Sequence, residues 1–82
     1  MEEQEVFVAV KRNAAPCPGV RVALVTKNET VYRITGEKGY ARLKPGLFPV
    51  FGTLYVDGKE IQYYRNHLFT GHEFWLENLH ED

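Results

Sequence analysis

The residue types best suited to chemistry in this chain are three histidines near its C-terminus. His67, His72 and His80 are separated by five and eight residues. Zinc sites that can be recognised in a sequence use shorter, paired spacings, so these intervals do not predict a metal centre, even with Glu73 beside His72. We expect solvated or locally hydrogen-bonded imidazoles, and no bound metal.

Cys17 is the only cysteine and lies between Pro16 and Pro18. A thiol becomes a nucleophile when a nearby base or cation favours its thiolate, and no base adjoins Cys17 in the sequence. We therefore expect an inert cysteine. A single cysteine also excludes an internal disulfide and favours a reducing compartment. With no catalytic motif elsewhere, the sequence predicts neither an enzyme nor a cofactor.

The remaining candidate site lies in the aromatic-rich stretch 48–64, FPVFGTLYVDGKEIQYY. Asp57-Gly58 within it predicts a two-residue type I′ turn, because both residues tolerate positive φ. That turn sets a hairpin register in which three pairs of residues face one another. They are Val56 with Lys59, Leu54 with Ile61, and Gly52 with Tyr63.

Alternation along the two arms of this hairpin separates a core face from an outer face. The core face is expected to hold Leu54, Val56, Ile61 and Tyr63, and the outer face Phe51, Thr53, Tyr55, Glu60, Gln62 and Tyr64. In this register Phe51 lies opposite Tyr64, and Tyr55 lies about 13 Å further along the strand.

Exposed aromatic rings on such a face would suit a protein or carbohydrate ligand, because they offer a large contact area with few rotatable bonds. We predict a binding surface at Phe51, Tyr55 and Tyr64, which Trp75 extends. The alternative is that these rings are covered by the loop 65–71 or by a neighbouring strand.

The elements that must position these residues all have the pattern of short strands. Apolar residues alternate in Val6–Lys11, where Val6, Val8 and Val10 are expected to face inward. Similar segments follow at 20–25, 30–35, 40–44, 48–56, 59–64 and 72–76. No apolar stripe recurs at helical spacing. The sequence predicts an all-β domain, either a seven-stranded antiparallel Greek-key sandwich of immunoglobulin-like type or a small barrel.

Length and charge narrow the organisation and the partners. The 82 residues fit one domain spanning 1–82, whose ends 1–4 and 79–82 we expect to fray. A net charge of -1 argues against nucleic acid, and the longest uncharged window is too short for membrane insertion. As it stands the sequence has no signal peptide, which indicates the cytoplasm; an extracytoplasmic location remains open if this is an excised domain.

Two segments resemble the carboxypeptidase regulatory-like and transthyretin-like superfamily. They are APCPGVRV at 15–22, after a first strand, and TGEKGYARL at 35–43 followed by PGLFPV at 45–50. The resemblance covers about residues 6 to 56 and implies a prealbumin-like sandwich. One enzymatic branch, a hydroxyisourate hydrolase, ends in a tyrosine-arginine-glycine-serine signature that this chain lacks.

A second branch of that superfamily, the surface-adhesin stalks, joins its first and last strands by a Lys-Asn cross-link. Lys11 and Asn78 invite this comparison. However, Lys11 has the parity of Phe7 and Ala9, opposite the expected core face, so we expect a surface lysine.

We therefore expect a non-catalytic protein-interaction or assembly module. Its partner is expected to be another protein or a second copy of the chain. A carbohydrate-binding module or an adhesin stalk domain is the alternative.

Overall fold

The structure, a computed structural model, describes residues 5–70 in full and the backbone of residues 76–80. These residues form strands and one short 3₁₀ turn, and no helix among them is long and apolar enough to cross a bilayer. The all-β prediction is confirmed. In chain order the elements are β1 (Val6–Arg12), β2 (Ala15–Pro16), β3 (Arg21–Thr26), β4 (Thr30–Ile34), β5 (Tyr40–Leu43), β6 (Val50–Val56), β7 (Lys59–Glu60), η1 (Gln62–Tyr64), β8 (His67–Phe69) and β9 (Leu76–His80).

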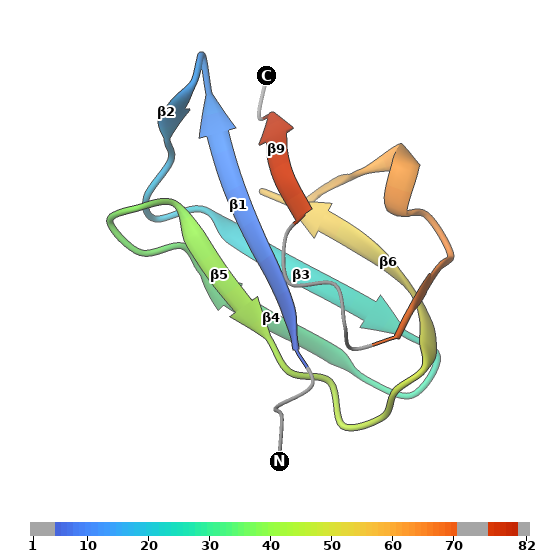
Figure 1. Cartoon of the computed structure of the whole chain (residues 1–82). Coiled ribbons are helices and arrows are strands. Elements are labelled where there is room, and N and C mark those ends of the chain that lie inside the picture. The colour runs from blue at the N-terminus through green and yellow to red at the C-terminus, as the bar shows by residue number, and fades with distance from the viewer. Residues whose placement is uncertain (1–4, 71–75, 81–82) are drawn as a thin grey trace.

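Sheet A is built around β1 (Figure 1). Antiparallel strands β5 and β2 pair with β1, β5 over Val6 to Ala9 and β2 over Lys11 and Arg12. The last strand, β9, also pairs with β1 but runs parallel to it, with a register shift between Val8 and Val10. The first and last strands of the chain are therefore neighbours.

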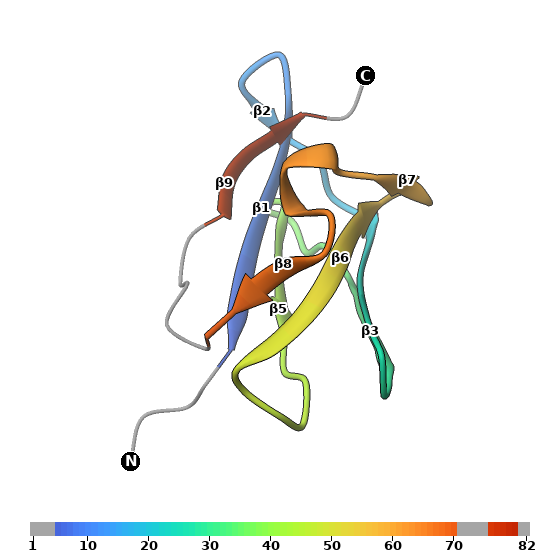
Figure 2. The same ribbon diagram turned by 90° about the vertical axis from the view of Figure 1, so that its right-hand side faces the viewer.

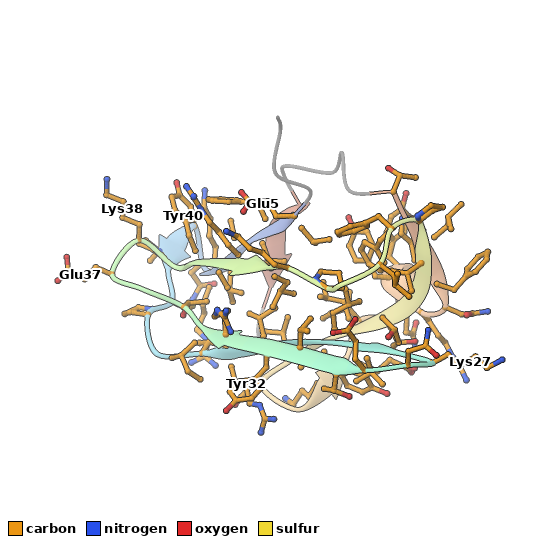
Figure 3. The ribbon with its side chains drawn as sticks, turned by 90° about the horizontal axis from the view of Figure 1, so that it is seen from below. Glu5, Lys27, Tyr32, Glu37, Lys38 and Tyr40 are labelled. Carbon is orange, nitrogen blue, oxygen red and sulfur yellow. The ribbon has the colours of Figure 1, made fainter. Side chains whose placement is uncertain are left out.

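Sheet B has the order β4-β3-β6, and β6 then pairs with both β7 and β8. Every pairing in this sheet is antiparallel. Figure 2 shows η1 between β7 and β8, beside β6. Seen from below, the two sheets form two layers, with Tyr40 on the outside of sheet A and Tyr32 on the outside of sheet B (Figure 3).

The core lies between the inner faces of the two sheets. Val6, Val8 and Val10 are fully buried, as the alternation in this segment predicts. They pack with residues of the same inward parity from the other strands. These partners are Val22, Leu24, Ala41, Leu43, Leu54, Val56 and Phe69.

The central hairpin begins as predicted and then departs from the prediction. Asp57 and Gly58 have φ of 53° and 78°, Val56 pairs with Lys59, and the Ile61 N–H donates to the Leu54 carbonyl at 2.9 Å. This is the expected type I′ turn and register. The pairing of Gly52 with Tyr63 is wrong, because Gly52 pairs with His67 of β8.

The chain leaves the ladder because η1 turns it away. The Tyr64 N–H donates to the Ile61 carbonyl and the Arg65 N–H to the Gln62 carbonyl, at 3.0 and 3.2 Å. Asn66, at φ 49°, then sends the chain back to β6, since asparagine tolerates the left-handed conformation. Tyr63, expected in the core, is consequently 78% exposed.

The last strand that the structure describes begins at the final residue of the strand predicted at 72–76. The expected strand 72–76 falls almost entirely on residues 71–75, which lie outside the described part, whereas β9 spans Leu76–His80. Leu79 and His80, expected to fray, pair with Val10 and Lys11. Their pairing with β1, the central strand of sheet A, explains why these two residues continue β9 instead of fraying.

Candidate interaction surface

The outer face of sheet B exposes a run of apolar and aromatic side chains. The register places Ala23 of β3 between Tyr32 of β4 and Tyr55 of β6. Alternate residues on these strands and on β8 share the same side. The large hydrophobic members exposed there are Val25 at 38%, Tyr32 at 51%, Ile34 at 54%, Phe51 at 57% and Leu68 at 41%. We call this set, with Tyr55, the sheet B patch.

A hollow of about 230 Å³ lies within the sheet B patch. The small Ala23 side chain leaves space between Arg21, Val25 and Tyr55, and Thr30 and Gly58 complete the lining. The Arg21 guanidinium lies 4.5 Å from the centre of the Tyr32 ring, a cation–π contact. The hollow thus combines an apolar wall with a cation and two hydroxyl-bearing residues, and it is smaller than a typical drug-sized pocket.

Two of the four predicted site residues lie on this surface. Phe51 and Tyr55 are both on β6 and share its outer face, Phe51 exposed and Tyr55 half-buried against the hollow. Tyr64 was wrongly placed: Leu68, not Tyr64, pairs with Phe51. Trp75 lies outside the described residues.

Tyr64 belongs instead to an aromatic cluster at the side of the core. Its ring centre lies 5.2 Å from that of His67 and 6.2 Å from that of Phe69, and Tyr63 stacks edge-on at 4.8 Å. Partial burial raises the pKa of the Tyr64 phenol, and the neighbouring Tyr63 phenol raises it further. The cluster packs η1 and β8 onto the core.

The other chemically capable side chains that the structure describes do not converge; His72, Glu73 and the His80 side chain lie outside the described part. His67 packs on Tyr64 and Phe69, and the described part of the chain contains no group of three His, Cys, Asp or Glu residues placed to hold a metal ion. Cys17 is half-buried, and its thiol lies 3.8 Å from the Ala15 carbonyl oxygen.

Lys11 and Asn78 lie on neighbouring strands, β1 and β9. Lys11 pairs with His80 rather than with Asn78, which lies within the register shift of β9, between the residues paired with Val8 and Val10. Lys11 is half-buried.

Sequence reasoning missed the part of the patch outside the central hairpin. Tyr32, Ile34 and Leu68 all lie on strands or segments whose apolar character is visible in the sequence. The register of β4 on β3 places Tyr32 and Ile34 on the outer face, because they pair with Ala23 and Arg21, whose parity is opposite to that of the buried Val22 and Leu24. Leu68 required the pairing of β8 with β6, which no local signal indicates.

Comparison with known proteins finds no matching family model, no matching curated protein and no matching solved structure.

Proposed function

We propose that this chain is a non-catalytic interaction module that binds a protein partner through the sheet B patch. The observation that carries the proposal is the exposure of Phe51, Tyr32 and Ile34 on one continuous sheet face. Exposed large apolar side chains are common singly, but contiguous groups of them mark contact surfaces. Aromatic residues at the centre of such a surface supply most of the binding energy.

The architecture supports a rigid presentation of this surface. The strands that carry the patch are held to one another by the ladders of β3 with β4 and β6, and their inner faces are anchored by Leu24 and Leu54. The two layers and the repeated crossing of the chain between them also suit a transthyretin-like Greek-key sandwich. If the two-residue β2 and β7 are set aside, seven strands remain. We propose that fold class for the chain.

A site-specific photo-crosslinker tests the proposed surface. Replacing Phe51 by p-benzoylphenylalanine places the reactive group within the patch, at its β8 end, without adding charge. On irradiation in cells we expect one discrete protein adduct. The matched control carries the same group at Lys38, an exposed turn position outside sheet B, and should give no adduct. Equal labelling at both positions, or none at either, would contradict the proposal.

The hollow beside Tyr55 favours a carbohydrate as a second candidate ligand. A sugar ring can pack its apolar face against an aromatic side chain, while Arg21 and Thr30 offer polar groups at the rim. Titrating glycans while following the NMR signals of Tyr55 and Ala23 tests this possibility. Saturable shifts confined to the hollow would support it, and unchanged spectra would exclude it.

A further inference from the structure

The outer edge of β4 is the longest edge in unbroken register among the described strands. Edge strands in natural proteins are usually short, charged, bulged or interrupted by proline. Here β2 contains Pro16, β5 carries Arg42, and β7 and β8 have two and three residues. The pairing of β9 is interrupted by a register shift. β4, with sequence TVYRI, has five residues in unbroken register and one charge, Arg33, whose guanidinium donates to the Tyr32 carbonyl at 2.9 Å.

The hydrogen-bond pattern identifies which groups of β4 point outward. At the two ends of the β3–β4 ladder, the Thr35 N–H donates to the Val20 carbonyl and the Thr26 N–H to the Glu29 carbonyl. Hydrogen-bonded pairs alternate along an antiparallel ladder, so the residues of β4 that bond β3 are Val31 and Arg33. The backbone groups of Thr30, Tyr32 and Ile34 therefore face away from β3.

We propose that β4 pairs with β4 of a second copy of this chain, antiparallel and about a two-fold axis at Tyr32. Tyr32 then bonds Tyr32 of the other copy through both N–H and carbonyl groups. In the single chain the Arg33 guanidinium donates to this carbonyl at 2.9 Å, so on pairing it must release or share the acceptor. Thr30 of each copy bonds Ile34 of the other. This isologous pairing uses only the outward groups, so neither copy breaks its own sheet.

The charges near the edge complement one another in this register. Arg33 lies opposite Val31 of the other copy, and its two diagonal neighbours there are Glu29 and Arg33. Glu29, one residue before β4, has the same parity as Val31 and Arg33, and in the single chain its carboxylate accepts the Gly46 N–H at 2.9 Å. Diagonal neighbours in an antiparallel pair are about 7 to 8 Å apart, within reach of long side chains. The two-fold axis produces this Arg33 and Glu29 contact twice.

The proposed dimer uses the backbone edge of β4, whereas the proposed protein partner contacts side chains on the outer face of sheet B, among them Tyr32 and Ile34 of the same strand. Phe51 lies on β6, two strands from β4 and so about 10 Å from that edge. The two copies would place their outer faces side by side, because pairing of edges continues the sheet. A Phe51 variant should leave the dimer intact, which separates a failure of this inference from a failure of the proposed function.

Amide hydrogen exchange of the unmodified chain gives the most direct test. In concentrated solution the amides of Thr30, Tyr32 and Ile34 should exchange more slowly than in dilute solution. The amides of Val31 and Arg33 are bonded within the monomer and serve as internal controls. Exchange of all five amides that is independent of concentration would overturn the inference, as would protection gained only at another element.

A proline substitution removes the central contact without touching the β3–β4 ladder. Tyr32→Pro deletes an outward N–H, and proline is tolerated at such edge positions. Loss of two hydrogen bonds per dimer should weaken association roughly 30-fold in sedimentation equilibrium. Tyr32→Thr retains the N–H and should weaken it by less than about fivefold. Equal association of the wild type and a folded Tyr32→Pro variant would overturn the proposal; if that variant does not fold, the exchange experiment decides.

A charge exchange tests the register. Arg33→Glu and Glu29→Arg each place like charges on the diagonal and should weaken their own homodimers. Mixed together, the two variants restore two opposite-charge contacts, so native mass spectrometry should show the mixed dimer in excess. A statistical mixture would contradict the two-fold register.

Discussion

Phe7 and Phe51 occupy comparable places on the two sheets, each on the outer face of a strand that has neighbours on both sides, yet Phe7 is 8% exposed and Phe51 is 57% exposed. The neighbouring strand makes the difference. β5 brings the Tyr40 ring to 5.0 Å from the Phe7 ring and the Arg42 guanidinium to 5.3 Å from its centre. Glu5 lies 4.0 Å from both Arg42 and Lys44, which holds these cations over the sheet. Phe51 faces only Leu68 on β8.

The comparison shows that parity alone does not decide exposure. Long amphipathic side chains can cover an outward ring with their stems and keep their charges in water. Sheet A uses this device at Phe7. On sheet B the Arg21 guanidinium lies over the Tyr32 ring, but Phe51 is left mostly exposed.

The largest difference is expected when each ring is removed. Phe7→Ala should lower the free energy of unfolding by about 3 kcal/mol, because it deletes a buried ring. Phe51→Ala should change it by less than about 1 kcal/mol, since its ring is mostly in water. Urea denaturation of the two variants measures both values, and similar losses would show that the two faces are equally covered.

The turns of the two sheets provide a second comparison. Gly39 and Gly58 have φ of 77° and 78°, so alanine is strained at either position. A Cβ at Gly39 would also lie 2.7 Å from the Val10 carbonyl oxygen, whereas nothing lies within 4 Å at Gly58. We expect Gly58→Ala to cost about 1 kcal/mol and Gly39→Ala about 2 to 3 kcal/mol in thermal or chemical unfolding. The reverse order would contradict the close packing of the Gly39 turn on β1.

Removing a side chain that covers Phe7 should expose an aromatic ring on the outer face of sheet A, as Phe51 is exposed on sheet B. Arg42→Ala removes the guanidinium above the ring and should cost about 1 kcal/mol of unfolding free energy. It should also increase binding of the dye ANS, because a new apolar surface is opened. Lys38→Ala, in an exposed turn, is the control and should alter neither property. Unchanged dye binding by Arg42→Ala would indicate that Tyr40 alone covers Phe7.

The smallest effect concerns the two neighbouring phenols of η1, beside sheet B. Burial first, and then the Tyr63 phenol, raise the Tyr64 pKa above its ordinary value of 10.0. The folded state therefore holds this proton more tightly than the unfolded state. Its stabilising contribution is fully present below pH 10 and is lost as the pH rises through the folded-state pKa. Tyr64→Phe should unfold less readily with rising alkalinity than the wild type, as measured by circular dichroism.

Tyr63→Phe is the matched variant for this titration. It removes the neighbouring phenol and leaves Tyr64 half-buried. The alkaline loss of stability should become smaller but should persist. If Tyr64→Phe and the wild type lose stability in parallel, burial of Tyr64 is not what makes the fold sensitive to alkali.

Much of the fold could be predicted because its determinants are local. The alternation in β1 and β3 indicated which residues are buried, and Asp57-Gly58 specified its own turn. The route after Ile61 could not be predicted in this way. The residue pattern after Ile61 fits one long hairpin arm as well as it fits two short arms separated by η1. The second arrangement is recognised only in the folded chain, where the Asn66 N–H donates to Thr53 Oγ1 at 3.0 Å.

The candidate site was predictable to the same extent. The prediction for Phe51 and Tyr55 required only the alternation of side chains along β6, and both residues lie on the expected face. The prediction for Tyr64 assumed that the second hairpin arm continues to residue 64, and it is wrong because that arm ends before η1. Placing Tyr32 and Ile34 on this surface requires the register of β4 on β3, which is fixed only when the strands pair in the folded chain.

The parallel pairing of β1 and β9 has a mechanical consequence. β1 and β9 run in the same direction, as their arrows show in Figure 1. The N-terminal end of β1 and the C-terminal end of β9 therefore lie at opposite ends of the pair. Tension transmitted through this pair acts along the strands and loads their shared hydrogen bonds together in shear, whereas an antiparallel pair pulled from one end opens one bond at a time. We therefore expect the β1–β9 pair to resist stretching along the β1 axis more strongly than an antiparallel pair that is opened from one end.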